Sequence, residues 1–268
     1  MKLQRIKIVG GLGLPFLLAV ALMICFGAPQ RAYAAEKSNC QIRGTADADC
    51  DGLPDEWESR VFGTDPSKAD TDSDGYADFL EVKNGFNPLG KGETSPKDFD
   101  IDGLDDRMEL LFGADPTDAD TDGDGFSDGK EVDSAFSPTS TSKAPLAKKI
   151  LIKLSTQEMS QTLGGVVVAK YKVSTGRKGA ATPPGEYKVM NKNPRAWSNH
   201  AKLWMPWWMQ FSLSGMGIHE LPEWPNGRKE GENHLGTPAS GGCVRLGVGP
   251  AKTMYDWTPV GTRISIVR

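Results

Sequence analysis

The run Lys149-Ile150-Leu151-Ile152-Lys153-Leu154 is rich in branched apolar residues and is bounded by turn residues, a pattern typical of a β-strand. A second such run follows at Gly165-Val166-Val167-Val168-Ala169-Lys170-Tyr171-Lys172-Val173. Further strand-like segments lie at residues 185–189, after a proline-stiffened turn, and at residues 261–267. Because no long amphipathic helix is evident among them, this half of the chain is predicted to be a β-rich sandwich or barrel.

The distribution of charge divides the chain into two unlike halves, although its formal net charge is only −4. Residues 47–131 contain 26 acidic and 7 basic side chains, whereas residues 145–268 contain 7 acidic and 17 basic ones. Such asymmetry predicts two domains with separate electrostatic tasks. A Ser/Thr/Pro-rich linker at residues 139–146 is expected to join an acidic region at residues 47–138 to a β-rich domain at residues 147–268.

The amino terminus has the features of a secretory signal. Basic residues precede an apolar core, which ends in the small-residue run Ala32-Tyr33-Ala34. Residues 1–34 are therefore predicted to be a signal peptide, followed by an amino-terminal segment at residues 35–46. The protein is expected to be exported to the periplasm, the cell envelope or the outside, where nucleic acid is not a partner. Two alternatives remain open: attachment through a lipidated Cys25, and an uncleaved membrane anchor.

Loss of the signal leaves three cysteines, which cannot all pair with one another. Cys40 and Cys50 lie close together in a loop-rich segment, where a disulfide would close a short loop and restrain a region with little core. Cys243 is then expected to be a free thiol, a candidate reactive group in an exported protein. Intermolecular pairing of Cys243 is the open alternative.

The acidic region is an internal duplication. Phe62-Gly63-Thr64-Asp65-Pro66 corresponds to Phe112-Gly113-Ala114-Asp115-Pro116, fifty residues later. Each copy holds two loops with the pattern Asp-x-Asp-x-Asp-Gly-x-x-Asp-x-x-Glu. In this spacing alternate carboxylates converge on one hard cation, the glycine permits a sharp turn, and the last Glu can bind through both oxygens. The natural occupant is Ca²⁺.

The expected calcium ligands are the acidic residues at positions 1, 3, 5, 9 and 12 of the four loops: Asp47, Asp49, Asp51, Asp55, Glu58, Asp70, Asp72, Asp74, Asp78, Glu81, Asp98, Asp100, Asp102, Asp106, Glu109, Asp120, Asp122, Asp124, Asp128 and Glu131. The gaps between loops leave room for a helical turn or two and not for full helix–loop–helix pairs. Residues 47–138 therefore resemble thrombospondin type 3 repeats more closely than EF-hands. With so few apolar residues between the loops, the metal is expected to supply much of the folding energy.

A small-residue loop, Ser240-Gly241-Gly242-Cys243-Val244-Arg245, holds the free cysteine of the basic half. Cysteine attacks carbonyl groups as the thiolate, so catalysis requires a nearby base and backbone N–H groups that bind the developing oxyanion. His219 is the expected base. The N–H groups of Gly242 and Cys243 are the expected oxyanion donors, because glycine lets the chain turn sharply with no side chain in the way.

Residues 149–268 resemble an L,D-transpeptidase catalytic domain of the YkuD-like family. The landmarks occur in order over about 120 residues: Ser174-Thr175-Gly176, Thr182-Pro183-Pro184-Gly185, Ile218-His219, Leu235-Gly236-Thr237-Pro238-Ala239-Ser240 and Gly242-Cys243-Val244-Arg245. The resemblance implies a mostly β fold with mixed sheets. It also implies a cysteine acyltransferase that needs no catalytic cofactor and acts on the stem peptides of peptidoglycan.

In that chemistry Cys243 attacks a stem-peptide carbonyl, His219 is the general base, and a thioester waits for an acceptor amine. The acceptor is open: a neighbouring stem peptide gives a cross-link, water gives a carboxypeptidase, and a lipoprotein lysine or other envelope protein gives an anchoring enzyme. Arg245 has two readings of equal weight, as the partner of a substrate carboxylate or as a salt bridge that holds the loop. Ser240 is expected at the substrate site, where its hydroxyl stabilises the turn.

Two departures from the family pattern bear on these roles. Gly241 stands where many members have a second histidine, and residues 220–240 form a longer segment between His219 and the cysteine loop than is usual. That segment contains His234, a rival for the role of base. A non-enzymatic, calcium-dependent surface-binding protein is the alternative function.

The aromatic run Trp204-Met205-Pro206-Trp207-Trp208-Met209 has two interpretations. Most of its rings are expected to pack in the core or on strands. One or two, with Trp197 or Trp224, are candidates to line the cleft and to stack on substrate.

Overall fold

The computed structural model describes residues 40–42, 44–94 and 97–268, so the predicted signal peptide lies outside the described residues. In the described part, no helix is long and apolar enough to cross a membrane. The predicted disulfide between Cys40 and Cys50 is present, and Cys243 is a free cysteine, as expected.

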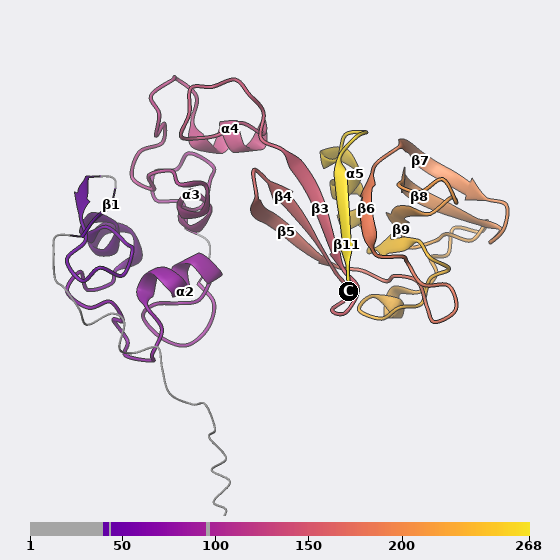
Figure 1. The fold of residues 1–268 in the computed structure, drawn as a ribbon, viewed down its shortest axis with the longest axis horizontal. Helices are drawn as coiled ribbons and strands as arrows, with labels where there is room; N and C mark the ends of the chain where they lie inside the picture. The colour runs from indigo at the N-terminus through magenta and orange to yellow at the C-terminus, as the bar shows by residue number, and fades with distance from the viewer. Residues whose placement is uncertain (1–39, 43, 95–96) are drawn as a thin grey trace, which may run out of the picture. The chain divides into compact units, whose positions relative to one another are not determined.

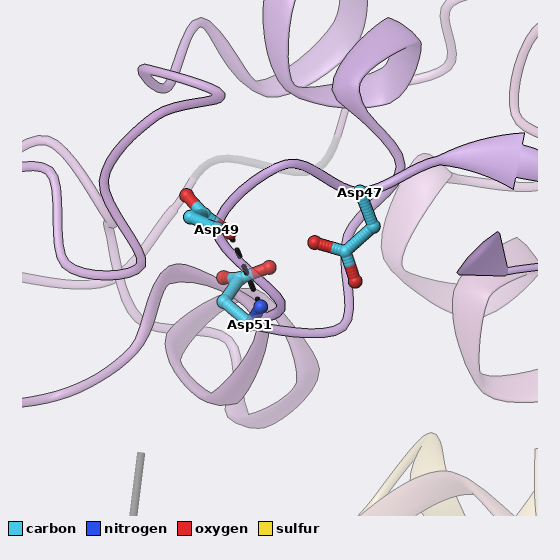
Figure 2. A group of neighbouring side chains, drawn as sticks. All are labelled: Asp47, Asp49 and Asp51. Carbon is cyan, nitrogen blue, oxygen red and sulfur yellow. Dashed lines mark hydrogen bonds between the residues drawn. The ribbon is translucent and has the colours of Figure 1, made fainter. Parts of the chain in front are cut away.

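The acidic half consists of loops and short helices (Figure 1). Its elements are β1 (Gln41–Ile42), β2 (Thr45–Ala46), α1 (Asp55–Trp57), the π-helix η1 (Glu58–Phe62), α2 (Asp78–Asn84), α3 (Asp106–Phe112) and α4 (Asp128–Asp133). Each helical segment begins at the ninth residue of an aspartate loop, which confirms the expected helical turn or two after each loop. Figure 2 shows the first loop, where the carboxylates of Asp47, Asp49 and Asp51 lie around one space.

The four loops are joined in pairs by equivalent hydrogen bonds. Asp51 of the first loop accepts one from the N–H of Phe79, at the start of α2 (2.9 Å). Asp102 of the third loop accepts one from the N–H of Gly129, at the start of α4 (2.6 Å). One fifty-residue copy of the duplication is therefore one pair of loops.

The basic half contains two mixed sheets. Its elements are β3 (Lys148–Lys153), β4 (Glu158–Leu163), β5 (Val166–Lys172), β6 (Gly185–Lys188), β7 (Asn191–Ser198), β8 (Leu203–Gln210), β9 (Gly217–Glu220), the 3₁₀ helix η2 (Glu232–His234), β10 (Val244–Leu246), α5 (Pro250–Trp257) and β11 (Arg263–Val267). One sheet has the order β5-β4-β3-β11-β6, and the other has the order β10-β9-β8-β7. The pairs β3–β11 and β9–β10 are parallel and the other pairs are antiparallel, which confirms the expected mixed-sheet β fold.

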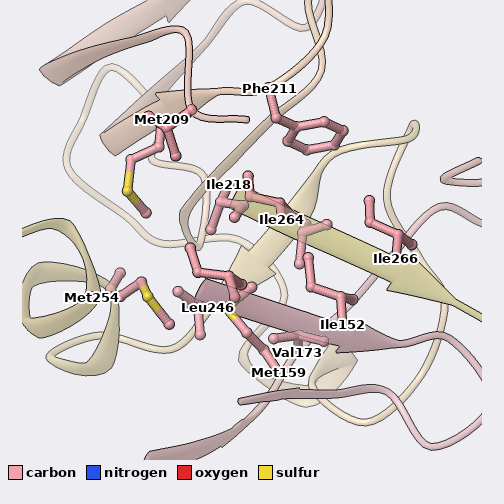
Figure 3. Packing of buried hydrophobic residues seen from close by; sticks show 14 residues of the cluster. Ile152, Met159, Val173, Met209, Phe211, Ile218, Leu246, Met254, Ile264 and Ile266 are labelled. Atoms are coloured by element: carbon pink, nitrogen blue, oxygen red, sulfur yellow. The ribbon is translucent and has the colours of Figure 1, made fainter. Parts of the chain in front are cut away.

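Both sheets contribute to one apolar core (Figure 3). Ile152 and Ile264 come from the neighbouring strands β3 and β11, whereas Ile218 and Leu246 come from β9 and β10. Met254 of α5 joins the same cluster, and all five side chains are fully buried. Strand β9, which carries His219, and strand β10, which directly follows Cys243, are thus fixed from one side by the core of the domain.

Gly129 packs so closely against the third loop that alanine should not fit. A Cβ atom at this position would lie 2.7 Å from the carbonyl oxygen of Asp102 and 2.9 Å from the nitrogen of Leu104. Although alanine favours helices, we expect Gly129→Ala to lower the stability of the second loop pair by about 1–3 kcal/mol, as overpacking does. Faster amide hydrogen exchange over residues 98–133 would report this loss. Lys130→Ala, an exposed change on the same helix, is the matched control and should leave exchange unchanged.

Candidate functional site

The parallel pairing of β9 and β10 places the two predicted catalytic residues together. His219 and Arg245 are register partners across this pair. Cys243 precedes Arg245 by two residues, and side chains two residues apart along an extended chain point to the same side. Because Ile218 and Val244 fill the core on the other side, His219, Cys243 and Arg245 share the face that lies away from it.

This face opens into a cleft of about 480 Å³. His219, Cys243, Arg245, Ser240 and Gly241 line one part of it. The opposite part is lined from the β7–β8 hairpin, which contributes Trp197, His200, Met205 and Trp208, and from the turn before β9, which contributes Met216. The predicted nucleophile and the predicted base therefore reach one solvent-accessible space.

The His219 imidazole is held in one tautomer. Its Nδ1 lies 2.5 Å from the backbone carbonyl of Glu220, which can only accept, so Nδ1 carries the proton. Nε2 is then unprotonated and able to take a proton. Burial is the main cause that lowers the pKa of His219 to about 4, and the nearby Arg245 charge acts in the same direction. The ring is therefore a neutral base at neutral pH.

Trp208 covers this imidazole, a contact that the sequence did not assign to a particular residue of the aromatic run. The two rings are stacked, with centroids 5.6 Å apart and planes at 29°. Trp197 also lines the cleft, whereas Trp207 packs against Tyr255. Trp208 of the aromatic run thus lines the cleft and Trp207 packs against another ring, whereas stacking on substrate stays a prediction.

The Cys243 thiol is largely buried, and burial raises its pKa. The backbone N–H of Gly217 and the positive charge of Arg245 oppose this effect. At neutral pH the resting pair is therefore a neutral thiol and a neutral imidazole, and proton transfer accompanies attack.

The loop before Cys243 is braced by Ser240. The Ser240 hydroxyl donates to the carbonyl of Cys243 (2.5 Å) and accepts from the N–H of Gly242 (3.1 Å). This matches the expected turn-stabilising role of Ser240. It corrects the role of Gly242, because an N–H directed to a hydroxyl inside the loop does not point to an oxyanion. In the described part of the chain, the N–H of Cys243 has no acceptor and remains a free donor.

The landmark Ser174-Thr175-Gly176 runs beneath this loop. Ser174 exchanges two backbone hydrogen bonds with Arg245, at 2.9 and 3.0 Å. The N–H of Ser240 donates to the carbonyl of Thr175 (2.9 Å), so the loop is tied to the same segment at both of its ends. In the sequence this motif is only a landmark, whereas its position in the fold gives it a mechanical role.

The long segment after His219 folds against the site. Lys229 pairs with Glu220 (2.5 Å) and with Glu223 (2.9 Å). Farther along, Glu230 lies 3.4 Å from the Arg245 guanidinium and the Nδ1 of His234 lies 3.5 Å from it. Arg245 thus has a protein carboxylate near it, and its buried Nε has no partner among the described residues. His219 lines the cleft with Cys243, whereas His234 is not among the lining residues.

The aspartates at the first, third and fifth positions of each loop gather in the acidic half. In all four loops their carboxylate oxygens lie within 4.8 Å of one another, as Figure 2 shows for the first loop. The ninth-position aspartates have a different place, because each accepts a hydrogen bond from the second residue of its own loop. For example, Asp78 accepts from the N–H of Thr71 (2.9 Å) and Asp106 from the N–H of Phe99 (2.8 Å). Through these hydrogen bonds the ninth-position aspartates stabilise the backbone of their loops.

The closing glutamates are buried beside these aspartates. Glu58 and Glu109 are fully buried, and both oxygens of Glu109 and one oxygen of Glu58 have no hydrogen-bond partner in the described residues. Burial, followed by repulsion from the loop aspartates, raises the pKa of Glu58 to about 8 and that of Glu109 to about 9. Buried, unpartnered carboxylates in a cluster of like charges are the donor set that a hard cation such as calcium requires.

The neutral resting state of the Cys243–His219 pair can be tested by alkylation with iodoacetamide. Without a reductant the Cys40–Cys50 disulfide stays closed, so Cys243 is the free thiol among the described residues, and the assay uses protein that lacks residues 1–34. Because His219 is uncharged above about pH 5, we expect the labelling rate to rise continuously up to and beyond about pH 8.5. A rate that has already levelled off at about pH 6 would instead indicate a thiolate–imidazolium pair. Cys243→Ser is the control and should not be labelled.

The solved structures that match this chain include several L,D-transpeptidases. One from Mycobacterium smegmatis has a TM-score of 0.42 and 19% sequence identity, over 46% of this chain and 60% of its own. L,D-transpeptidase 3 from Mycobacterium tuberculosis, in complex with a faropenem-derived adduct, has a TM-score of 0.40 and 18% sequence identity, and the match covers 50% of this chain and 66% of that one. An L,D-transpeptidase from Stackebrandtia nassauensis has a TM-score of 0.41 and 21% sequence identity, and the match covers 71% of this chain and 90% of that one. The chain spans about three fifths of the length of the first of these.

Both halves match known family models, whereas no curated protein matches the chain. The model of the L,D-transpeptidase catalytic domain, YkuD, matches residues 147–266. The model of the bacterial TSP3 repeat matches residues 47–69 and 120–134. The chain therefore carries an L,D-transpeptidase catalytic domain preceded by bacterial TSP3 repeats.

Proposed function

We propose that this chain is an exported peptidoglycan L,D-transpeptidase that acts through a Cys243 thioester. The observation that carries the proposal is that His219 on β9 and Cys243, directly before the parallel strand β10, line one cleft, with the imidazole fixed as a neutral base. The catalytic domain is assigned to residues 147–268, the repeats to residues 47–138 and the linker to residues 139–146. Export agrees with the Cys40–Cys50 disulfide, because such bonds persist in oxidising compartments.

In the first step, Cys243 Sγ bonds to the stem-peptide carbonyl carbon at the L-centre of the diamino acid. His219 Nε2 takes the thiol proton as the carbonyl oxygen becomes an oxyanion. The carbon–nitrogen bond then breaks, and the imidazolium returns its proton to the departing amine of the terminal D-amino acid. The product is a thioester on Cys243 and a neutral His219.

In the second step, the side-chain amine of a neighbouring stem peptide attacks the thioester carbon. His219 takes a proton from this amine, the carbon–sulfur bond breaks, and the Cys243 sulfur regains a proton from the imidazolium. The result is a peptide cross-link and the resting enzyme. Water in place of the amine would give a carboxypeptidase, and a lysine of an envelope lipoprotein would give an anchored protein.

Arg245 is assigned to the substrate carboxylate. Its guanidinium lines the cleft, and its contact with Glu230 is long for a charge-assisted hydrogen bond, at 3.4 Å. A substrate carboxylate that approaches the unpartnered Nε of Arg245 would satisfy a buried donor.

Acylation by faropenem tests the nucleophile and the base, since a faropenem-derived adduct is present in the Mycobacterium tuberculosis relative. We expect the intact mass of the wild-type chain to increase by one adduct, and that of Cys243→Ala not to change. His219→Ala should acylate about 10²–10⁴ times more slowly, as loss of a general base does. His234→Gln, a change at the rival histidine, should acylate much faster than His219→Ala.

The absence of an adduct on the wild-type chain would refute the enzymatic function and leave the calcium-dependent surface-binding protein. An adduct on Cys243→Ala would show that another residue is the nucleophile. Equal rates for the two histidine variants would refute the assignment of His219 as the base.

We further propose that the four loops of residues 47–138 bind calcium and form a spacer or docking module for the catalytic domain. The support is the four clusters of carboxylates and the buried, unpartnered closing glutamates. When bound, calcium would neutralise carboxylates that otherwise repel one another, which links metal binding to folding of the repeats.

Calcium binding to the full chain can be measured by titration calorimetry after chelation. We expect about four ions per chain, one for each cluster. Glu109→Gln replaces a fully buried carboxyl group of the third loop by an amide and should weaken or abolish one site. The exposed Glu93→Gln is the matched control and should bind as the wild type. Chelation should also unfold residues 47–138 while residues 147–268 stay folded, so an unchanged circular dichroism spectrum would contradict the proposal.

A further inference from the structure

Thr182 belongs to the landmark Thr182-Pro183-Pro184-Gly185, for which the proposed mechanism has no use. Its side chain is buried beneath the catalytic loop, with 1% of its surface exposed. The Thr182 hydroxyl donates to the carbonyl oxygen of Gly242 (2.9 Å). The same hydroxyl accepts from the N–H of Gly176 (2.8 Å), so its proton is directed to Gly242.

This contact fixes the plane of the peptide bond between Gly242 and Cys243. In a trans peptide the carbonyl and the following N–H point in opposite directions, because the six atoms of the unit are coplanar. The Gly242 carbonyl points down to Thr182, so the Cys243 N–H points to the other side of the loop. Cys243 itself lines the cleft, and its N–H has no acceptor within the described residues.

Other contacts of the loop do not replace Thr182. Ser240 holds the N–H of Gly242 and the carbonyl of Cys243, which belong to the two neighbouring peptide units. Gly242 has a φ of 116°, in a region where glycine meets no side-chain barrier. The peptide unit between Gly242 and Cys243 therefore depends on Thr182 for its orientation.

We propose that Thr182 is a positioning residue, which aims the Cys243 N–H into the cleft as the oxyanion donor of the acylation step. The inference rests on the proposed thioester function. Of the two expected donors it retains the Cys243 N–H, since the Gly242 N–H is directed to Ser240, and it assigns roles to two motifs that lie far from Cys243 in sequence.

Gly176 also helps to hold the Thr182 hydroxyl in place. A Cβ atom on Gly176 would lie 2.1 Å from the carbonyl oxygen of Ala180 and 2.5 Å from the nitrogen of Thr182. Glycine at this position lets the two segments approach until the Gly176 N–H reaches the Thr182 hydroxyl. The motifs Ser174-Thr175-Gly176 and Thr182-Pro183-Pro184-Gly185 thus converge beneath the catalytic loop as one support.

The test compares two reactions of the same thiol in the full chain. Acylation by faropenem develops negative charge on a carbonyl oxygen and needs the oxyanion donor. Alkylation by iodoacetamide displaces iodide at a saturated carbon and does not need it. We expect Thr182→Val, which keeps the shape and loses the hydroxyl, to acylate on the order of tenfold to a hundredfold more slowly, somewhat less than when a donor is removed outright. Its alkylation rate should equal that of the wild type.

Thr182→Ser retains the hydroxyl and should restore the acylation rate, and melting curves confirm that the variants are folded at the assay temperature. If Thr182→Val is acylated at the wild-type rate, the inference is overturned. It is also overturned if acylation and alkylation of Thr182→Val slow equally, because the defect then lies in the thiol. Thr182→Ser as slow as Thr182→Val would also overturn it. These results refute the role of Thr182 alone, whereas a wild-type chain that forms no adduct refutes the proposed function as well.

Discussion

The parallel pairing of β9 with β10 is the constraint on which the candidate active site depends. It sets His219 opposite Arg245, and it places Cys243, two residues before Arg245 and directly before β10, on the same face. The register holds because the alternate residues of both strands are buried in a core to which both sheets contribute. A slip by one residue would turn the cysteine into the core and the apolar side chains into the cleft.

The loop that precedes the nucleophile shows how a flexible sequence is held in one conformation. Ser240 and two adjacent glycines provide almost no side-chain packing of their own. Order comes from outside the loop, from the backbone of residues 174–176 and from the buried Thr182 hydroxyl. Glycine is required where these segments meet, because the closeness of Gly176 to its neighbours leaves no room for a Cβ atom. The positions of catalytic groups on such a loop therefore depend on the hydrogen bonds that hold the loop.

The stability of the acidic half has a different physical basis. Its apolar cluster is small, and each closing glutamate has at least one buried oxygen without a hydrogen-bond partner in the described residues, an arrangement that is costly for charged groups. Repulsion within each loop opposes the fold, while the hydrogen bonds of Asp51 and Asp102 join the loops in pairs. The β-rich half thus gains its stability from apolar burial, whereas the acidic half has clustered carboxylates that are compatible with a bound cation.

Patterns local in sequence were sufficient for much of this protein. Periodicity of apolar residues predicted β3, β5, β6 and β11, spacing of aspartates predicted the four loops, and cysteine counting predicted both the disulfide and the free thiol. Strands such as β4, with the sequence Glu158-Met159-Ser160-Gln161-Thr162-Leu163, escaped notice because buried polar residues interrupt the apolar pattern.

What only the tertiary structure decided are the partners of polar groups that lie far apart in the chain. The sequence named Cys243 and His219, but the fold directed the Gly242 N–H to Ser240, the Gly242 carbonyl to Thr182 and Trp208 onto the imidazole. It also turned the ninth-position aspartates to the loop backbone. The reason is that a local pattern reports which side of a strand or turn a residue occupies, whereas the direction of a hydrogen bond depends on which distant segment packs there.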